Sequence, residues 1–207
     1  MSAGTPAATP SAALTDRARR QRRRILEASM ACFVERGFHA ASMAAIAERA
    51  GMSPGLIYHY FTGKGDIVRA IIDLQLGRSG AILDQLDSAG DLVAAIAGAF
   101  SQWCQPGCEG LSATLFLEMT AEATRDPEVA ALTRTADREI RGRVEEALRR
   151  SMTAAGATPD DATVRRRALM LLCLVHGLAV RAVREPDLEP DVLAAGLEEV
   201  VAALVRG

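Results

Sequence analysis

The sequence predicts an all-α fold of one or two domains, and three features of its composition and pattern support that prediction. Apolar residues make up 49% of the 207 residues, enough to bury a core, while aromatic residues make up only 4%. Alanine is abundant and β-branched runs are scarce, which favours helices over strands. Apolar residues recur three and four positions apart, the helical period, and no segment sustains the period of two that is typical of strands.

The charged residues divide unevenly along the chain, although the total is close to neutral at −2. Residues 1–78 hold 11 basic and 6 acidic side chains, a net charge of +5, whereas residues 79–207 hold 13 basic and 20 acidic side chains, a net charge of −7. A basic N-terminal third is typical of a module that binds a polyanion such as nucleic acid. The alternative is a solvated surface whose uneven charge serves no partner.

No stretch of the sequence has the roughly 20 apolar residues that a membrane span needs. The longest, Ala168–Val180, is shorter and contains His176, so we interpret it as a buried helix and expect no membrane partner. The N-terminus lacks the basic start and apolar stretch of a signal peptide. Residues 1–18 are largely Ala, Ser, Thr and Pro before their first charges, and we expect a disordered tail on a cytoplasmic protein.

The first two helices are predicted from their ends. A basic arm, Arg17–Arg24, has six Arg in eight positions and leads into a helix over residues 19–36. Gly37 follows as the C′ residue, where a positive φ costs glycine little. A second helix begins after Ser42, whose hydroxyl can accept a hydrogen bond from an otherwise unpaired backbone N–H, and ends at Gly51.

The third helix is short and has two unlike faces. Ser53 caps it and Pro54 takes its first position, where a missing N–H costs nothing. Ile57 and Phe61, four residues apart, point inward. The opposite face carries Pro54, Gly55, Tyr58 and His59. Two short helices joined by a tight glycine turn, the second one exposed, describe a helix-turn-helix, in which the second helix enters the DNA major groove. The alternative is an ordinary small helix with a surface Tyr and His.

The rest of the chain is predicted to be helical. Residues 62–66 form a turn into a fourth helix, which has Lys64 at its N-terminus and apolar positions between Ile67 and Leu74. Glycine and proline breaks then separate further helices. Their expected ranges are 80–88, 91–104, 109–124, 127–155, 160–185 and 190–206.

Residues 22–74 resemble the DNA-binding domain of the tetracycline-repressor (TetR) family. The resemblance rests on Ile-Ala-Glu-Arg-Ala-Gly-Met-Ser, followed by Gly-Leu-Ile-Tyr-His-Tyr-Phe and then Gly-Lys, and it covers about a quarter of the chain. It implies a helix-turn-helix DNA-binding domain over residues 19–78. A fourth helix would join this domain to a C-terminal helical bundle over residues 79–207 that dimerises and binds a small-molecule effector.

By this resemblance the chain is a transcriptional regulator whose partner is a double-stranded DNA operator. Tyr58 and His59 are expected to contact phosphates and base edges, and Ser42 and Lys64 are expected to hold phosphates. The full set of expected DNA contacts is Arg22, Arg23, Ser42, Ser53, Pro54, Gly55, Leu56, Tyr58, His59 and Lys64.

The sequence departs from the family pattern at a few positions. Ala44 stands where some members carry a polar residue that reads DNA. Gly63 and Gly65 stand where Ser or Asn and an acidic residue are common. The arm Arg17–Arg24 is richer in arginine than in most members, and we hypothesise that it enters the adjacent minor groove.

The C-terminal helices are expected to form a homodimer, because one short recognition helix reads few bases and needs a second copy about 34–36 Å away. The last two helices carry apolar stripes that suit a four-helix bundle with a partner. The expected interface residues are Leu174, Leu178, Val192, Leu197, Val200, Val201 and Leu204. The alternative is that both helices complete the core of a single chain.

An effector cavity is implied by the resemblance and only weakly by the residues themselves. The large and polar side chains of the C-terminal part supply the candidates, and each could equally belong to the core. They are Phe100, Trp103, Phe116, Glu118, Met119, Glu122, Met170, Cys173 and His176.

Other function classes have less support. The sequence holds no HExxH, GxSxG or P-loop pattern, so we expect neither an enzyme nor a cofactor. An architectural or activating DNA-binding protein that needs no ligand is one alternative. A thiol or metal sensor built from Cys104, Cys108 and Cys173 is another, although these cysteines lack the paired spacing of zinc sites.

Overall fold

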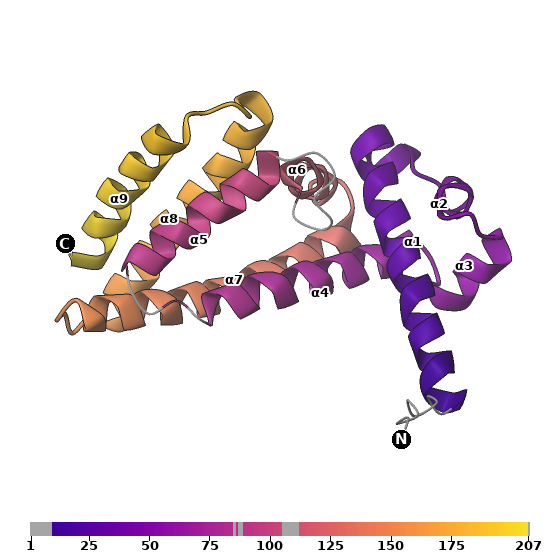
Figure 1. The fold of residues 1–207 in the computed structure, drawn as a ribbon, viewed down its shortest axis with the longest axis horizontal. Coiled ribbons are helices and arrows are strands. Elements are labelled where there is room, and N and C mark those ends of the chain that lie inside the picture. Colours follow the sequence, from indigo (N-terminus) through magenta and orange to yellow (C-terminus); the bar gives the residue numbers. More distant parts are fainter. Residues whose placement is uncertain (1–9, 85, 87–88, 105–111, 207) are drawn as a thin grey trace, which may run out of the picture. The chain divides into compact units, whose positions relative to one another are not determined.

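The computed structural model describes residues 10–84, 86, 89–104 and 112–206, and within these ranges every regular element is an α-helix (Figure 1). The all-α fold expected from the sequence is confirmed. The chain divides into two compact units, Met1–Ile67 (unit 1) and Val68–Gly207 (unit 2), and the division falls inside the fourth helix. Among the described residues, no helix is both long enough and apolar enough to span a membrane.

Unit 1 is built from α1 (Pro10–Ala40), α2 (Met43–Ala50), α3 (Pro54–Tyr60) and the first turn of α4 (Lys64–Leu83). Both glycines that were expected to end a helix have a positive φ, although α1 continues beyond the first of them to Ala40. Gly37 has a φ of 75° and interrupts the helical path of α1, and Gly51 has a φ of 60° and closes α2. Both angles lie in the left-handed region, which glycine adopts without a Cβ clash.

The two expected serine caps are also confirmed. The Ser42 Oγ accepts a hydrogen bond from the backbone N–H of Ala45 at 3.1 Å. The Ser53 Oγ accepts one from the N–H of Leu56 at 3.3 Å. Each bond satisfies an N–H that the helix itself leaves unpaired. Since Pro54 follows Ser53 directly, the start of α3 is fixed by two adjacent residues.

The inner faces of these helices meet in a small apolar core. α1 packs on α2, and α2 packs on α3. The rings of Phe33 and Phe38 lie 5.0 Å apart, centre to centre. The largest fully buried side chains of this unit are Ile25, Phe33, Ile46, Ile57, Phe61 and Ile67. Because Ile57 and Phe61 are held from within, the opposite face of α3 has a fixed orientation.

Two helix boundaries differ from the sequence prediction. α1 begins at Pro10, so residues 10–18 are helical and the expected disordered tail through residue 18 is wrong for that stretch. Alanine and arginine favour helix, and proline suits a first helical position. The expected separate helix over residues 80–88 is also wrong, because α4 continues unbroken through Gly77 to Leu83.

Unit 2 contains the rest of α4 and five further helices. They are α5 (Ala89–Cys104), α6 (Ala113–Glu122), α7 (Pro127–Ala154), α8 (Asp161–Arg184) and α9 (Pro190–Arg206). α5 packs against α8 and α9, α7 packs against α8, and α6 packs against α7 and α8. Their inward stripes form one apolar core that includes Leu92, Leu148, Leu171 and Leu197.

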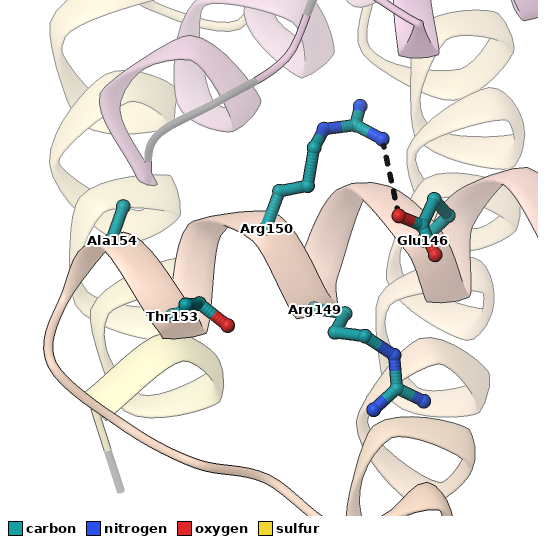
Figure 2. Close-up of a pocket in the computed structure, with 5 residues that line it drawn as sticks. All are labelled: Glu146, Arg149, Arg150, Thr153 and Ala154. Atoms are coloured by element: carbon teal, nitrogen blue, oxygen red, sulfur yellow. Dashed lines mark ion pairs between the residues drawn. The ribbon is translucent and has the colours of Figure 1, made fainter.

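Arginine side chains close two helix ends in unit 2. Arg150 on α7 donates hydrogen bonds to the backbone oxygens of Leu83 and Leu86, at 2.9 and 3.0 Å. Figure 2 draws this side chain among the residues that line a pocket on α7, and marks its ion pair with Glu146. Arg167 donates to the backbone oxygen of Leu204 at 2.8 Å, near the end of α9. These bonds satisfy carbonyls that a helix end leaves unpaired.

Candidate nucleic-acid interface and ligand cavity

The outer face of α3 is exposed and polar, as its sequence predicts. Tyr58 exposes 55% of its surface and Leu56 exposes 38%, whereas Ile57 between them is fully buried. His59 is also exposed, and its ring stands edge-on to Tyr60 with 5.2 Å between the centres. The face therefore presents a phenol and an imidazole, groups that can donate to phosphates and to base edges.

Two exposed hydroxyls flank this face. Ser42 and Ser53 both cap helices through their oxygens and both remain exposed. A serine hydroxyl that accepts a hydrogen bond still has its own proton to donate. Each cap residue can therefore hold a phosphate oxygen without giving up its structural bond.

The structure gives Lys64 a structural bond that the sequence did not predict. Its Nζ donates to the backbone oxygens of Phe38 and His39, at 3.0 and 3.3 Å. The same ammonium lies 4.8 Å from the centre of the Phe38 ring. An ammonium has three protons to donate. Two are used on the end of α1, so at most one proton is left for the expected phosphate contact.

The two expected arginine contacts also have partners inside unit 1. The Arg22 guanidinium lies 4.5 Å from the centre of the Phe61 ring, a cation–π contact at the end of α3. The Arg23 Nε donates to the Glu27 carboxylate at 2.6 Å, one turn along α1. Both side chains remain exposed, and these contacts orient them.

A two-point ion pair between α1 and α2 was missed by sequence reasoning. The guanidinium of Arg49 donates from both terminal nitrogens to both carboxylate oxygens of Glu35. The Arg49 hydrogen bond holds the pKa of Glu35 below its usual value. The partners are 14 residues apart, so no helical spacing reveals them. The pair fixes α2 against α1 on the solvent side, opposite the apolar core.

Unit 2 contains a cavity of about 440 Å³ between α4, α5, α6, α7 and α8. Its walls are mostly apolar, and its polar groups include Gln75, Thr133 and Asp137. Such a composition is typical of small-molecule sites. The predicted residues that line it are Trp103, Phe116, Met119 and His176.

His176 is the most distinctive group of the cavity wall. Its ring lies 5.1 Å from the Phe116 ring, with the planes tilted by 32°. His176 is partly exposed at the cavity wall; its partial burial lowers its pKa, and the negative charge of Asp137 partly opposes that shift. The imidazole is therefore neutral at pH 7, when it can donate one hydrogen bond and accept another.

The other five predicted ligand residues lie outside the cavity wall. Phe100 belongs to the apolar core, and Glu122 is buried on α6 with Arg125 3.8 Å away. Glu118, Met170 and Cys173 do not line the cavity either, and the last two face solvent. Sequence reasoning missed the α4 and α7 contributions, among them Ile72, Ser79, Arg134 and Ile140. These residues lie on helices that are far apart in the sequence, so their spacing along the chain does not indicate that they line one cavity.

An apolar face on α8 and α9 has no covering within the described chain. Its exposed members are Leu169, Met170, Val183, Val192 and Val200. The prediction of interface residues was wrong for Leu178, Leu197 and Val201, which are buried in the core of the same chain. Leu174 and Leu204 pack partly against that core. The apolar stripes of the sequence do not distinguish the inner face of these two helices from the outer one.

The described cysteines belong to no metal-binding cluster. Cys104 is half-buried and Cys173 is exposed, while Cys108 falls outside the described residues. Burial raises the pKa of the Cys104 thiol, which lowers its reactivity. No group of three or more His, Cys, Asp or Glu side chains suited to a metal ion occurs in the part of the chain that the structure describes.

Comparisons with known proteins match both units. Residues 25–71 match the model of bacterial regulatory proteins of the tetR family. Residues 81–206 match the model of the C-terminal part of BetI-type transcriptional repressors.

Individual proteins are similar over nearly the whole length. The HTH-type transcriptional regulator UidR of Escherichia coli K12 is 29% identical over 192 residues, covering 89% of this chain and 92% of UidR. The structure of Salmonella enterica GusR superposes with a TM-score of 0.75 at 25% identity, covering 90% of this chain and 95% of GusR. A Saccharomonospora viridis regulator solved with choline has the same fold, with a TM-score of 0.68 at 24% identity, covering 88% of this chain and 96% of that one.

Proposed function

Because the chain belongs to the TetR family of bacterial transcriptional regulators, we propose that it is a homodimeric repressor that a small-molecule effector releases from its operator. The observation that carries this proposal is the pairing of an exposed recognition helix in unit 1 with an apolar cavity in unit 2. A repressor that a ligand releases needs both, one to bind DNA and one to sense the ligand. Proteins of this family are in general not enzymes.

On DNA, α3 enters the major groove with Tyr58 and His59 toward base edges and phosphates. Pro54, Gly55 and Leu56 approach the bases at the start of the helix, where thymine methyl groups give apolar contacts. Lys64 adds its remaining N–H to a phosphate. The serine caps and the two partnered arginines complete the contact set: Ser42, Ser53, Arg22 and Arg23.

The dimer forms through the uncovered apolar face of α8 and α9. Val192 and Val200 expose 59% and 42% of their surfaces on one side of α9, and Met170 exposes 52% on α8. Two copies of this face make a four-helix bundle that removes these side chains from water. A two-fold dimer presents two recognition helices to a two-fold operator.

The effector is a mostly apolar molecule with at least one hydrogen-bonding group. Trp103, Phe116 and Met119 offer an apolar and aromatic wall, and the neutral imidazole of His176 offers a donor and an acceptor. A ligand that fills about 440 Å³ is of drug size or smaller.

Ligand binding reaches the DNA-binding unit through α4, which is one continuous helix. Ile72, Gln75 and Ser79 of α4 line the cavity, and Lys64 at its start is bonded to the end of α1. An effector that prefers a different position of α4 thereby changes the placement of the recognition helix. Such a preference is required, because a ligand with equal affinity for both states shifts nothing.

The DNA-binding part is tested by selecting an operator from random duplexes with the wild-type dimer and then measuring the affinity of Tyr58→Ala/His59→Ala for it. We expect the double variant to fold normally, since both side chains are exposed, and to lose operator binding. Normal operator binding by this variant would remove α3 from its assigned role.

The effector part separates the proposal from a ligand-independent architectural or activating protein. A thermal-shift screen of small molecules should find ligands that raise the melting temperature, because a ligand that binds only the folded state stabilises it. Such a ligand should weaken operator binding, and Trp103→Ala should reduce its effect. A sensor that uses Cys104, Cys108 or Cys173 would instead respond to oxidant or metal.

A further inference from the structure

The N-terminal end of α1 forms a basic helical extension, residues 16–24. Every residue over 16–20 is exposed, so this part of α1 projects beyond the apolar core of unit 1. Arg17, Arg20 and Arg24 recur at three and four residues and therefore share one side of the helix. Within the described residues these three have no hydrogen bond or ion pair, and residues 1–15 contain no acidic side chain.

The ion pair at the start of the extension neutralises little of its positive charge. Arg19 lies 3.7 Å from Asp16, but the two side chains expose 77% and 59% of their surfaces. An exposed pair of this kind contributes little, and a phosphate can replace the carboxylate. The extension thus holds more positive charge than the chain itself neutralises.

Two contacts fix the direction of this extension relative to the recognition helix. The Arg22 guanidinium lies over Phe61, the residue that caps the end of α3. Arg24 covers Gly51, the residue that closes α2; a Cβ at that position would lie 2.6 Å from the Arg24 Nη2. The extension therefore leaves unit 1 beside the turn and the end of the helix-turn-helix, next to the proposed DNA face.

The helical form argues against the sequence-based hypothesis that this arm lies in the minor groove. An α-helix with its side chains is about 10–12 Å across, whereas the minor groove of B-DNA is about 6 Å wide. A helix can lie along the phosphate ridge beside a groove. There, arginines spaced along one side meet successive phosphates, which bind guanidinium well.

We propose that the extension is a second DNA-contacting surface, in which Arg17 and Arg20 bind backbone phosphates that flank each half-site. This inference rests on the proposed function, since it assumes that α3 docks on DNA. Contacts of this kind add affinity and salt dependence but carry no sequence information. The extension accordingly strengthens binding to any duplex and leaves the choice of operator to α3.

The test compares wild type with Arg17→Ala/Arg20→Ala by fluorescence anisotropy on two 40-bp duplexes, a selected operator and a random sequence, over 50–200 mM salt. Each lost phosphate contact lowers the slope of log K against log salt by about 0.9. Four contacts in a dimer lower it by about 3.6. Over that fourfold range of salt, the wild-type affinity then falls about 150-fold more than that of the variant. The ratio of operator to random affinity stays unchanged.

A matched control removes the same charge elsewhere. Arg165→Ala/Arg206→Ala deletes two exposed arginines of unit 2 that have no hydrogen bond or ion pair within the described residues. Its salt slope should equal that of wild type. A circular dichroism melt of each variant confirms that unit 1 remains folded, since none of the four arginines contributes to a core.

The outcomes are distinct. If selection with the wild-type protein yields no operator, that result contradicts the proposed function itself. A wild type that binds, with an unchanged slope in Arg17→Ala/Arg20→Ala, contradicts only the phosphate contacts of the extension. If Arg17→Ala/Arg20→Ala loses affinity only for duplexes with A·T-rich flanks, the phosphate-backbone assignment is overturned in favour of minor-groove insertion. Ala18→Pro, which keeps all six arginines but breaks the helix at Ala18, should weaken binding to both duplexes, and unchanged binding would show that helical form is not needed.

Discussion

The ammonium of Lys64 donates a 3.0 Å hydrogen bond to the backbone oxygen of Phe38 and lies 4.8 Å from the centre of the same residue's ring. A second bond reaches the backbone oxygen of His39. The three contacts tie the start of α4 to the last residues of α1, which follow the kink at Gly37. A residue expected only at the DNA surface thus also joins the two helices that flank the helix-turn-helix.

Replacing Lys64 by Met should lower the free energy of unfolding by about 1–3 kcal/mol, because the partly buried carbonyl of Phe38 and the exposed carbonyl of His39 lose a charged donor. Equilibrium urea unfolding followed by circular dichroism measures this. Arg69→Met, which removes an exposed charge from the next turn of α4 without breaking a bond in the described structure, should change stability by less than about 0.5 kcal/mol. Equal stability of Lys64→Met and wild type would assign the lysine to DNA binding alone.

Gly55→Ala should separate stability from DNA binding. A Cβ at Gly55 meets no atom within 4 Å, and alanine favours helix over glycine by up to about 1 kcal/mol, so the variant should be as stable as wild type or more so. Its operator affinity should nevertheless fall about tenfold, equivalent to ~1.4 kcal/mol, because the methyl group lies where the helix backbone approaches DNA.

Gly142→Ala is the matched control for that substitution. Its Cβ position is equally open, but it lies on α7 in unit 2. The control should gain the same helix propensity and leave operator affinity unchanged. If both variants bind DNA like wild type, the start of α3 does not approach the bases.

His176 should make stability fall in mild acid. Burial places its pKa below the ordinary 6.5, so the unfolded chain takes up the proton first as the pH falls. The stabilisation is complete above about pH 6.5 and is lost progressively as the pH falls toward the lower folded value. The drop in melting temperature between pH 7.5 and pH 5.5 should be smaller in His176→Gln, which does not titrate. An equal drop in both proteins would place the pH dependence on other groups.

Local chemistry made α3 predictable from sequence. Ser53 and Pro54 begin it, and the spacing of Ile57 and Phe61 identifies its inner face; the structure agrees with each. α4 was cut too early, because Gly77 has open space beside it and costs the helix only propensity, which packing overrides.

Unit 2 was harder to predict for a different reason. The cavity draws on five helices, and a sequence states which face of a helix is apolar but not which neighbour covers it. The stripe on α9 illustrates this limit. Leu197 and Val200 both looked suited to an interface, yet Leu197 is 2% exposed and Val200 is 42% exposed.

The difference in exposure between Leu197 and Val200 leads to the prediction for the dimer. Val192→Asp/Val200→Asp should dissociate it, because a dimer through this face would bury two carboxylates per chain without partners. In size-exclusion chromatography with light scattering, wild type should show twice the 22.0 kDa chain mass, and the variant should show a single chain. The helical circular dichroism spectrum should persist, since both positions are exposed in the isolated chain.

Ile82→Asp changes an apolar side chain of α4 that is equally exposed, at 41%, and should remain dimeric. A dimeric Val192→Asp/Val200→Asp would move the interface away from α9. A monomeric variant should also lose operator affinity, because one recognition helix alone reads too few bases.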